Sequence, residues 1–285
     1  MKSNKAKRFF TLQRKYLSIP YIVFLVLFIL VPIGIVMFYA FTYEYTDPAT
    51  GVKYISASGQ AFLNFFTSWS KWNVLFVSLF IATLTTLLCL LIGFPLAYFL
   101  ADKKVNKNAV FVTLFIAPMW INFVLRTGAT RDLLTWIGIN GGNHPYIATL
   151  IGMVQNYLPF VILPLYTTML KLDKSQIEAA ADLGANPFQV FVKTIIPMTI
   201  PGIVSAATMT FMPTMSSYVI ANKMSENKTK IIGNIIEYWF GESAAINGQN
   251  IGSVLSLVML MIIGISLLIQ KAIDAKTDSR KVEIW

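Results

Sequence analysis

The sequence is poor in the charged residues that soluble proteins use on their surface. Only 13% of its 285 residues are charged, whereas 56% are hydrophobic. A soluble globular domain has about a quarter of its residues charged, and a disordered chain combines low hydrophobicity with high net charge. This composition, with a mean hydropathy of +0.64, excludes both classes and indicates a membrane protein.

Residues that build catalytic and metal sites are also scarce. The single cysteine, Cys89, lies within an apolar run, and the single histidine, His144, lies in a Gly-Gly-Asn-His-Pro turn. Neither a disulfide framework nor the usual three- or four-ligand zinc site fits such a sequence. The G-x-x-x-x-G-K-[ST] phosphate loop and the G-x-S-x-G elbow do not occur. We therefore expect a chain that is not an enzyme, has no catalytic residues and binds no metal or cofactor itself.

Long charge-free stretches dominate the sequence. Six of them hold the ~20 apolar residues that cross a bilayer. Lipid offers no partner to backbone polar groups, so we predict an all-α, polytopic fold with six transmembrane helices. Their predicted ranges are 21–43, 74–100, 109–125, 146–170, 198–221 and 252–269. The first run is too long for a signal-peptide core and lacks a small-x-small cleavage site, so we expect it to be retained.

The charges between these runs predict the orientation of the chain. Of the 23 lysines and arginines, 16 fall in the segments on the same side as the N-terminus. The positive-inside rule then places both termini in the cytoplasm. We divide the chain into a basic N-terminus (1–19), a transmembrane domain (20–273) with an inner loop (171–197), and a C-terminal tail (274–285). The net charge of +10 thus reflects topology, and we expect a lipid bilayer and no nucleic acid as a partner.

The inner loop, residues 171–197, contains a predicted short helix. Ser175 and Glu178 have the spacing of a capping box, and Gly184 followed by Asn186-Pro187 is a stop signal. Glu178 and Asp182 are four residues apart and share a helix face. The alanines at 179–181 leave room for another surface to approach closely. Two interpretations stay open on this pattern: a helix that docks on a cytoplasmic partner, or a capped surface helix with an incidental acidic face.

The inner loop resembles the EAA loop of ATP-binding-cassette (ABC) importer permeases, E-A-A-x3-G-x9-I-x-L-P. The matching positions are Glu178, Ala179, Ala180, Gly184 and Pro197, while Thr194 and Ile196 replace the Ile and Leu of the pattern. The resemblance implies a type I ABC importer permease fold in a bacterial plasma membrane. It also implies that the helix, including Asp182, couples the chain to a separate ATPase subunit that binds ATP and Mg.

Further stretches resemble the permeases for spermidine and putrescine uptake. They are residues 118–126, 171–174, 195–203 and 232–236. This resemblance implies a heterodimer with a second permease subunit, a dimer of ABC ATPases and an extracytoplasmic substrate-binding protein. The expected function is therefore that of the permease subunit of an ATP-driven polyamine importer.

A polyamine is a flexible polycation, so its path should carry carboxylates and aromatic faces. The candidate path residues near predicted outer helix ends are Tyr43, Glu44, Asp132, Glu237 and Trp239. The alternative is that these carboxylates are solvated and the aromatics form an interfacial belt. Arg126 and Arg131 count against a simple cation funnel, and we expect them to pair with Asp132 or with the partner permease.

Other functions fit the sequence less well. An anion permease of the same family would predict a basic outer cavity. A single-chain secondary transporter would need ionisable residues inside the membrane, and the six predicted helix cores show essentially none. The small residues of the fifth run, including Ser205, Ala206, Ser216 and Ser217, predict close packing at a permease interface and gate.

Overall fold

The computed structural model describes residues 19–47, 51–102, 110–241 and 247–282. The predicted N-terminal segment 1–19 lies outside these ranges except for Ile19, and the predicted tail 274–285 lies outside them from 283 onward. The chain forms two compact units, one of residues 1–68 and 236–258 and the other of residues 69–235 and 259–285.

Membrane-spanning helices make up most of the described chain. Four helices are long and apolar enough to cross a membrane: Ile19–Ala40, Trp69–Ala101, Pro145–Met169 and Gly248–Ile273. Two bent pairs, Val110–Trp120 with Phe123–Trp136 and Pro187–Met198 with Ile200–Ser216, bring the number to six if each pair is one span. The prediction of an all-α polytopic membrane protein is confirmed.

The first unit carries an apolar helix whose side chains are exposed. It comprises α2 (Ile19–Leu25), a π-helical stretch η1 (Val26–Leu30) and α3 (Val31–Ala40), followed by α4 (Gln60–Phe66). No side chain in the most apolar window of Ile19–Ala40 is buried. Its apolar side chains are thus suited to contact with lipid or protein. The unit also includes the end of α14 (Ile232–Phe240) and the start of α15 (Gly248–Val282).

A two-stranded β-hairpin follows the first helix. Strands β1 (Thr42–Thr46) and β2 (Lys53–Ala57) pair antiparallel, with Tyr43 opposite Ser56 and Tyr45 opposite Tyr54. The predicted first helix, 21–43, therefore ends three residues early, at Ala40. Gly51, at φ 67°, donates its N–H to the Asp47 carbonyl at 2.8 Å, which turns the chain back. The aromatic and β-branched residues of both strands favour this extended pairing.

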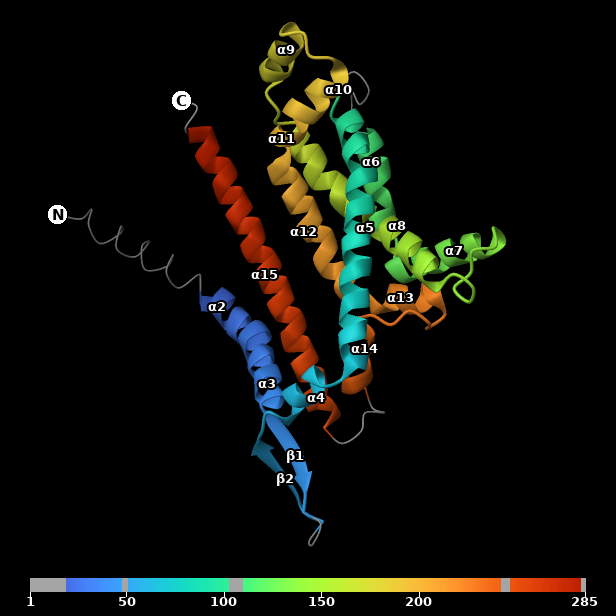
Figure 1. Ribbon diagram of the computed structural model, residues 1–285, viewed down its shortest axis with the longest axis vertical. Coiled ribbons are helices and arrows are strands. Elements are labelled where there is room, and N and C mark those ends of the chain that lie inside the picture. The colour runs from blue at the N-terminus through green and yellow to red at the C-terminus, as the bar shows by residue number, and fades with distance from the viewer. Residues whose placement is uncertain (1–18, 48–50, 103–109, 242–246, 283–285) are drawn as a thin grey trace, which may run out of the picture. The chain divides into compact units, whose positions relative to one another are not determined.

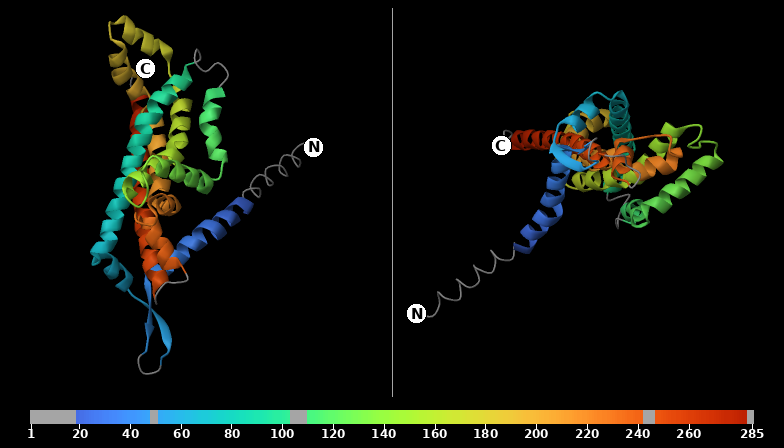
Figure 2. Two further views of the ribbon diagram at one scale, coloured as in Figure 1. Left: turned by 90° about the vertical axis from the view of Figure 1, so that its right-hand side faces the viewer. Right: turned by 90° about the horizontal axis from the view of Figure 1, so that it is seen from below.

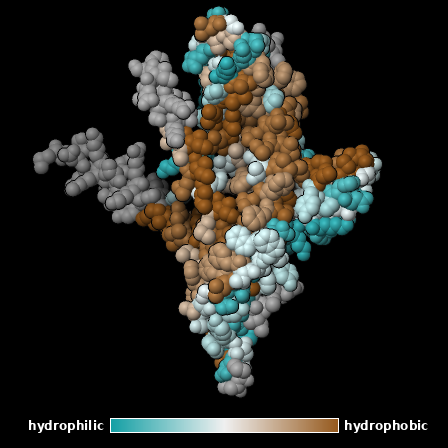
Figure 3. Space-filling view, in the orientation of Figure 1, coloured by the Kyte–Doolittle hydropathy of each residue, from teal (hydrophilic) through white to brown (hydrophobic). Residues whose placement is uncertain are grey.

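Three helices form the core of the second unit. Helices α5 (Trp69–Ala101), α8 (Pro145–Met169) and α12 (Ile200–Ser216) pack against one another, as Figures 1 and 2 show. Their buried side chains include Cys89, Met153, Val161, Leu165 and Ala206. Figure 3 shows hydrophobic residues along these helices and hydrophilic ones around α9. The outer faces of these helices are thus suited to lipid.

Glycines let the core helices approach closely. A Cβ at Gly93 of α5 would lie 2.8 Å from Cγ1 of Val161, and one at Gly202 of α12 would lie 2.6 Å from Oγ1 of Thr168. Small residues at such crossings are the usual device for close packing of helices in membranes. The close packing of α8 against α5 and against α12 therefore depends on these two positions.

The third predicted helix, 109–125, is not continuous. Helix α6 (Val110–Ile116) passes into a 3₁₀ turn, η2 (Ala117–Trp120), and the chain bends by 98° before α7 (Phe123–Trp136). Pro118 lacks an N–H, and the Asn122 side chain accepts the Val124 N–H at 2.9 Å to begin a new helix. The predicted range 109–125 is therefore divided at Pro118 and Asn122, and the two parts form one of the bent pairs that count as a span.

The fifth predicted helix, 198–221, is also divided. Helices α10 (Pro187–Val190), η3 (Phe191–Ile195) and α11 (Ile196–Met198) lead to α12 through a bend of 68°. Helix α12 stops at Ser216, and α13 (Tyr218–Ser225) begins after Ser217, whose φ and ψ of −76° and 57° are not helical. The apolar run therefore contains two helices rather than one.

Gly202→Ala tests the close contact of α12 with α8. The added methyl group meets Thr168, so we expect destabilisation of about 1–3 kcal/mol from overpacking. Gly128→Ala in α7 is the matched control, since a Cβ there has no atom within 4 Å and alanine favours a helix by about 1 kcal/mol over glycine. Thermal unfolding in detergent measures both, and equal behaviour of the two variants would contradict the packing.

Candidate functional site

The helix of the inner loop begins at a cap different from the predicted one. Helix α9 spans Lys174–Asp182, and its N-cap is Asp173, whose Oδ1 accepts the Ser175 N–H at 3.0 Å and the Ser175 hydroxyl at 2.8 Å. The prediction of Ser175 as the cap is therefore wrong by two residues. An aspartate is as good a cap as serine, and its carboxylate adds a favourable interaction with the helix dipole.

The end of α9 is where the sequence placed it. Gly184 has a φ of 86°, its N–H donates to the Ala181 carbonyl at 2.9 Å, and the Ala185 N–H donates to the Ala180 carbonyl at 3.3 Å. This pair of bonds is a Schellman motif, which requires a left-handed residue at the glycine. Asn186 then does more than stop the helix, because it forms a capping box with Gln189 and begins α10.

The inner loop presents an exposed surface of mixed character. Glu178, Ala179, Asp182, Gly184 and Pro197 are exposed, while Ala180 is half-buried. Leu183 and Phe188 are apolar yet 88% and 74% exposed. Large apolar side chains so exposed next to an acidic face are typical of a protein-binding surface.

A cavity of about 350 Å³ lies beside α9. It is lined by the end of α5, the end of α8 and the first turns of α9, including Asp102, Met169, Lys174, Ile177 and Glu178. The cavity links the inner loop to the two core helices that run through the membrane.

The five candidate path residues fall into different units. Tyr43, Glu44, Glu237 and Trp239 belong to the first unit, and Asp132 belongs to the second. Their shared role along one path stays a prediction.

Glu44 lies on β1 and is paired. Its carboxylate forms an ion pair with Lys53 of β2 at 2.7 Å. Its backbone N–H donates to Oδ1 of Asn247 at 2.5 Å, and Nδ2 of Asn247 donates back to the Glu44 carbonyl at 3.0 Å. The neighbouring Tyr43 ring lies 5.3 Å from that of Tyr45. Glu44 is thus fixed in position in the middle of β1.

Glu237 and Trp239 lie on α14. Glu237 is exposed, and Trp239 is half-buried with its ring 5.4 Å from that of Tyr238. This arrangement places one solvated carboxylate next to an aromatic pair.

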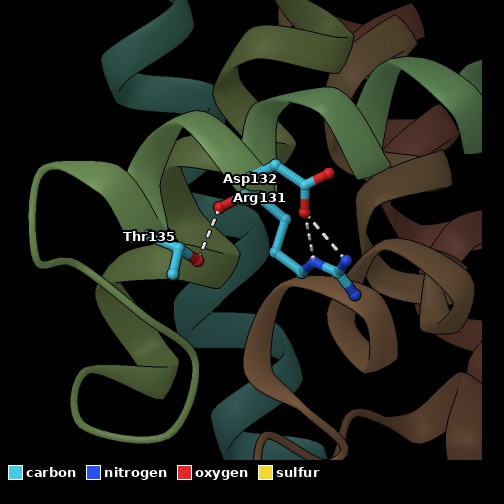
Figure 4. Close-up of polar contacts among 3 residues, drawn as sticks. All are labelled: Arg131, Asp132 and Thr135. Carbon is cyan, nitrogen blue, oxygen red and sulfur yellow. Dashed lines mark hydrogen bonds and ion pairs between the residues drawn. The ribbon is translucent and has the colours of Figure 1, made fainter.

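Asp132 pairs with its neighbour Arg131, as the sequence suggested. Nη2 and Nε of Arg131 donate to Oδ1 of Asp132 at 2.8 and 3.1 Å, and the Thr135 hydroxyl donates to the Arg131 carbonyl at 2.9 Å (Figure 4). The two charged side chains remain 44% and 63% exposed. An exposed pair of this kind contributes about 0–1 kcal/mol.

Arg126 lies in a place that the sequence did not predict. Its Nε and Nη2 donate to Oδ1 of Asn156 at 2.9 and 2.7 Å, and Nη1 donates to the Pro118 carbonyl at 2.8 Å. Asn156 is eleven residues into α8, or about 17 Å from its start, which is near the middle of a ~30 Å bilayer core. Arg126 is therefore bound to the interior of the protein and not to an outer loop.

Arg126 lines a cavity of about 590 Å³, called here the Arg126 cavity. Its other lining residues come from η2, α7, α8, α12 and α13 and include Trp120, Phe123, Asn156, Tyr157, Phe160, Ser217 and Tyr218. Among the described residues that line this cavity, Arg126 carries a charge and the others are neutral. The sequence held a signal for this site, because Gln155 and Asn156 are two adjacent amides within a charge-free, mainly apolar run.

The described residues contain no group of three or more His, Cys, Asp or Glu side chains placed to hold a metal ion.

A family comparison covers both the inner loop and the Arg126 cavity. Residues 90–279 match the family described as binding-protein-dependent transport system inner membrane component. The chain belongs to this family. It is thus a multi-pass component of a transport system in a bacterial inner membrane, as the resemblance of the inner loop predicted.

Similar curated members of this family are permeases named for polyamine transport. The spermidine/putrescine transport system permease protein PotB of Salmonella typhimurium is 34% identical over 211 residues, which cover 69% of this chain and 72% of that protein. PotB of Escherichia coli is 33% identical over the same share of this chain and 76% of its own length.

Solved structures show the same fold. A chain from a bacterial ABC transporter for import of the acidic polysaccharide alginate superposes with a TM-score of 0.65, at 17% identity, over 95% of this chain and 98% of that one. A second structure, of an alginate ABC transporter in complex with a pentasaccharide-bound periplasmic protein, gives 0.66 at 14% identity, with 93% of each chain covered. The predicted ABC importer permease fold is confirmed.

Two arginines of α7 should differ in their effect on stability. Arg126→Gln leaves buried Asn156 without its main donor, so we expect a loss of about 1–3 kcal/mol. Arg131→Gln removes only an exposed pair and should change stability by less than about 1 kcal/mol. Thermal unfolding in detergent measures the two variants side by side. A larger loss for Arg131→Gln would contradict the assignment of these two environments.

Proposed function

We propose that this chain is one of two permease subunits of an ATP-driven importer of polyamines such as spermidine and putrescine. The observation that carries the proposal is the 33–34% identity to the PotB permeases over about two thirds of the chain. The partners follow from this function: a second permease of different sequence, a dimer of ABC ATPases and a substrate-binding protein outside the membrane.

The inner loop is the contact with the ATPase in this proposal. The exposed side chains of Leu183 and Phe188 supply apolar area, and Glu178 and Asp182 supply an acidic face. Only four residues separate the last residue of α8, Met169, from the first of α9, Lys174. Movement of α9 is therefore passed directly to a core helix.

Transport then proceeds by alternating access. The binding protein delivers the substrate on the outer side, and ATP with Mg is bound and hydrolysed by the ATPase dimer. Closure of that dimer draws the inner loops of the two permeases together and switches the passage between its two openings. The free energy comes from nucleotide bound to the ATPase, so this chain transmits movement and carries out no chemistry.

A polycation would have to exchange partners with the candidate path residues. Glu44 is held by the Lys53 ammonium and Asp132 by the Arg131 guanidinium. A substrate ammonium is able to replace either cation because both pairs are partly exposed and screened. The tyrosines next to Glu44 and the aromatic pair next to Glu237 offer ring faces to the same cation.

One observation favours a second candidate, an anion importer of the same family. The charged side chain in the Arg126 cavity is positive. A cation crossing that cavity requires carboxylates from the partner permease, whereas an anion would bind the guanidinium directly.

Competition for uptake decides between the two substrates. The complete complex, with its binding protein, is reconstituted into liposomes that contain ATP, and uptake of labelled spermidine is measured. Excess putrescine should reduce this uptake strongly, whereas excess sulfate or molybdate should leave it unchanged. Uptake of a labelled anion without uptake of spermidine would replace the polyamine proposal with the anion one.

Gly184→Asp tests the docking role of the inner loop. A non-glycine residue at φ 86° strains the Schellman motif, and the new carboxylate adds charge beside Asp182. We expect polyamine uptake to be abolished while the chain still inserts into the membrane, and the same result for deletion of residues 178–184. Uptake into cells and the amount of membrane-inserted protein are the measurements.

Gly138→Asp is the matched control for this variant. Gly138 also has a positive φ, of 85°, and is exposed, but it lies between α7 and α8. It suffers the same backbone strain without touching the inner loop, so uptake should be retained. Normal co-purification of the ATPase with the 178–184 deletion would count against the docking role.

A further inference from the structure

Two helix breaks of the second unit line the Arg126 cavity. One is the 98° bend between η2 and α7, and the other is the interruption between α12 and α13 at Ser217. Residues from both breaks, including Trp120, Asn122, Ser217 and Tyr218, form its walls. The shape of this cavity therefore depends on what holds the two breaks in place.

Asn156 of α8 holds the first break. Its Oδ1 accepts Nε and Nη2 of Arg126, and Nη1 of the same guanidinium reaches the Pro118 carbonyl on the far side of the bend. The Asn156 amide is itself oriented, since its Nδ2 donates to the Thr127 hydroxyl at 3.1 Å and to the Gly152 carbonyl at 2.8 Å. Asn156 is only 2% exposed. The bend between η2 and α7 is thereby fixed to one turn of α8.

Tyr157, the next residue of α8, holds the second break. Its hydroxyl forms a hydrogen bond with that of Ser217. The Ser217 hydroxyl donates to the Pro213 carbonyl at 2.8 Å, so its proton is committed and Tyr157 is the donor. The interruption between α12 and α13 is thereby fixed to the same turn of α8.

Helix α8 continues from this turn to the inner loop. Met169, the last residue of α8, lies twelve positions after Tyr157, which corresponds to about 18 Å of helix. Thr168 near this end contacts the Gly202 position of α12. Helix α8, which includes Pro159 and Pro164, is thus a continuous helical connection between the inner loop and the turn that holds both breaks.

We propose that Asn156 and Tyr157 are positioning residues that convert movement of the inner loop into a change in shape of the Arg126 cavity. The proposal rests on the proposed function, because the movement originates in the ATPase. Neither residue needs to touch the substrate. Loss of either contact should leave ATP hydrolysis in place while reducing the substrate moved for each ATP.

Tyr157→Phe is the mildest test, because it removes one hydroxyl and keeps the ring. In the complete reconstituted transporter, we expect spermidine uptake per ATP hydrolysed to fall about fivefold, the effect of one buried hydrogen bond on an equilibrium. Asn156→Asp keeps the acceptor for Arg126 and should retain more activity than Asn156→Ala. Thr149→Val is the control, since its buried hydroxyl donates only within α8, to the Pro145 carbonyl, and its ratio should stay at the wild-type value.

A second measurement does not depend on the substrate. Val219→Cys places a thiol in the wall of the Arg126 cavity, in a chain whose own Cys89 is replaced by alanine. The reaction rate of this thiol with a membrane-impermeant reagent should differ between nucleotide-free and ATP-bound complex. Tyr157→Phe should reduce that difference, and Thr149→Val should not.

The outcomes separate the two proposals. Absence of spermidine uptake by the wild-type complex would overturn the polyamine assignment, while the thiol measurement still tests the role of Tyr157. An unchanged nucleotide-dependent difference in Tyr157→Phe would overturn the positioning role. So would uptake and ATP hydrolysis that fall together in proportion to the amount of assembled complex, since that result indicates a role in folding alone.

Discussion

Inside a bilayer, a helix that stops or bends frees backbone groups for which lipid offers no partner, and each one left unpaired costs several kcal/mol. The second unit of this protein bends its chain within an apolar run and meets this constraint with side chains. The Asn122 side chain accepts the Val124 N–H at the start of α7, and Arg126 donates to the Pro118 carbonyl, which also accepts the Ile121 N–H at the bend. Ser216 and Ser217 do the same for the Pro213 carbonyl near the end of α12. Polar residues are thus placed where the backbone requires them.

The same constraint explains why an arginine lies so deep in the chain. A guanidinium has five donors in a fixed plane, so it is able to bridge two backbone segments and an amide at once. Within the described residues, Arg126 bonds only to neutral oxygens, those of Asn156 and Pro118. Its charge therefore remains available to the field of the cavity, because no carboxylate of the described residues pairs with it.

The sequence was most informative where one physical signal acts over many residues. The long apolar runs predicted the spanning helices, and the glycine of the inner loop predicted the end of α9. It was least informative where a few polar atoms override such a run. Pro118 and Asn122 divide the third apolar run. The fifth run is divided at Ser217, whose hydroxyl forms a hydrogen bond with that of Tyr157, sixty positions earlier in the sequence. The cap at Asp173 and the hairpin at 42–57 were missed because local rules allow more than one conformation at each place. In the hairpin, hydrogen bonds of β1 with Asn247 and Asn250 support the conformation that is adopted.

The inner loop caps its helices with its own residues. Asp173 accepts a backbone N–H in the first turn of α9, and the Schellman hydrogen bonds pair carbonyls of its last turn. The capping box of Asn186 and Gln189 then begins the next helix, so all these bonds lie within residues 173–189. Such a segment has already lost most of its conformational entropy before any partner arrives. Binding therefore does not have to pay for folding the loop, and a preorganised surface associates more tightly for the same contact area. Substitutions on the outer face of α9 should then alter affinity for the partner without altering the shape of the loop.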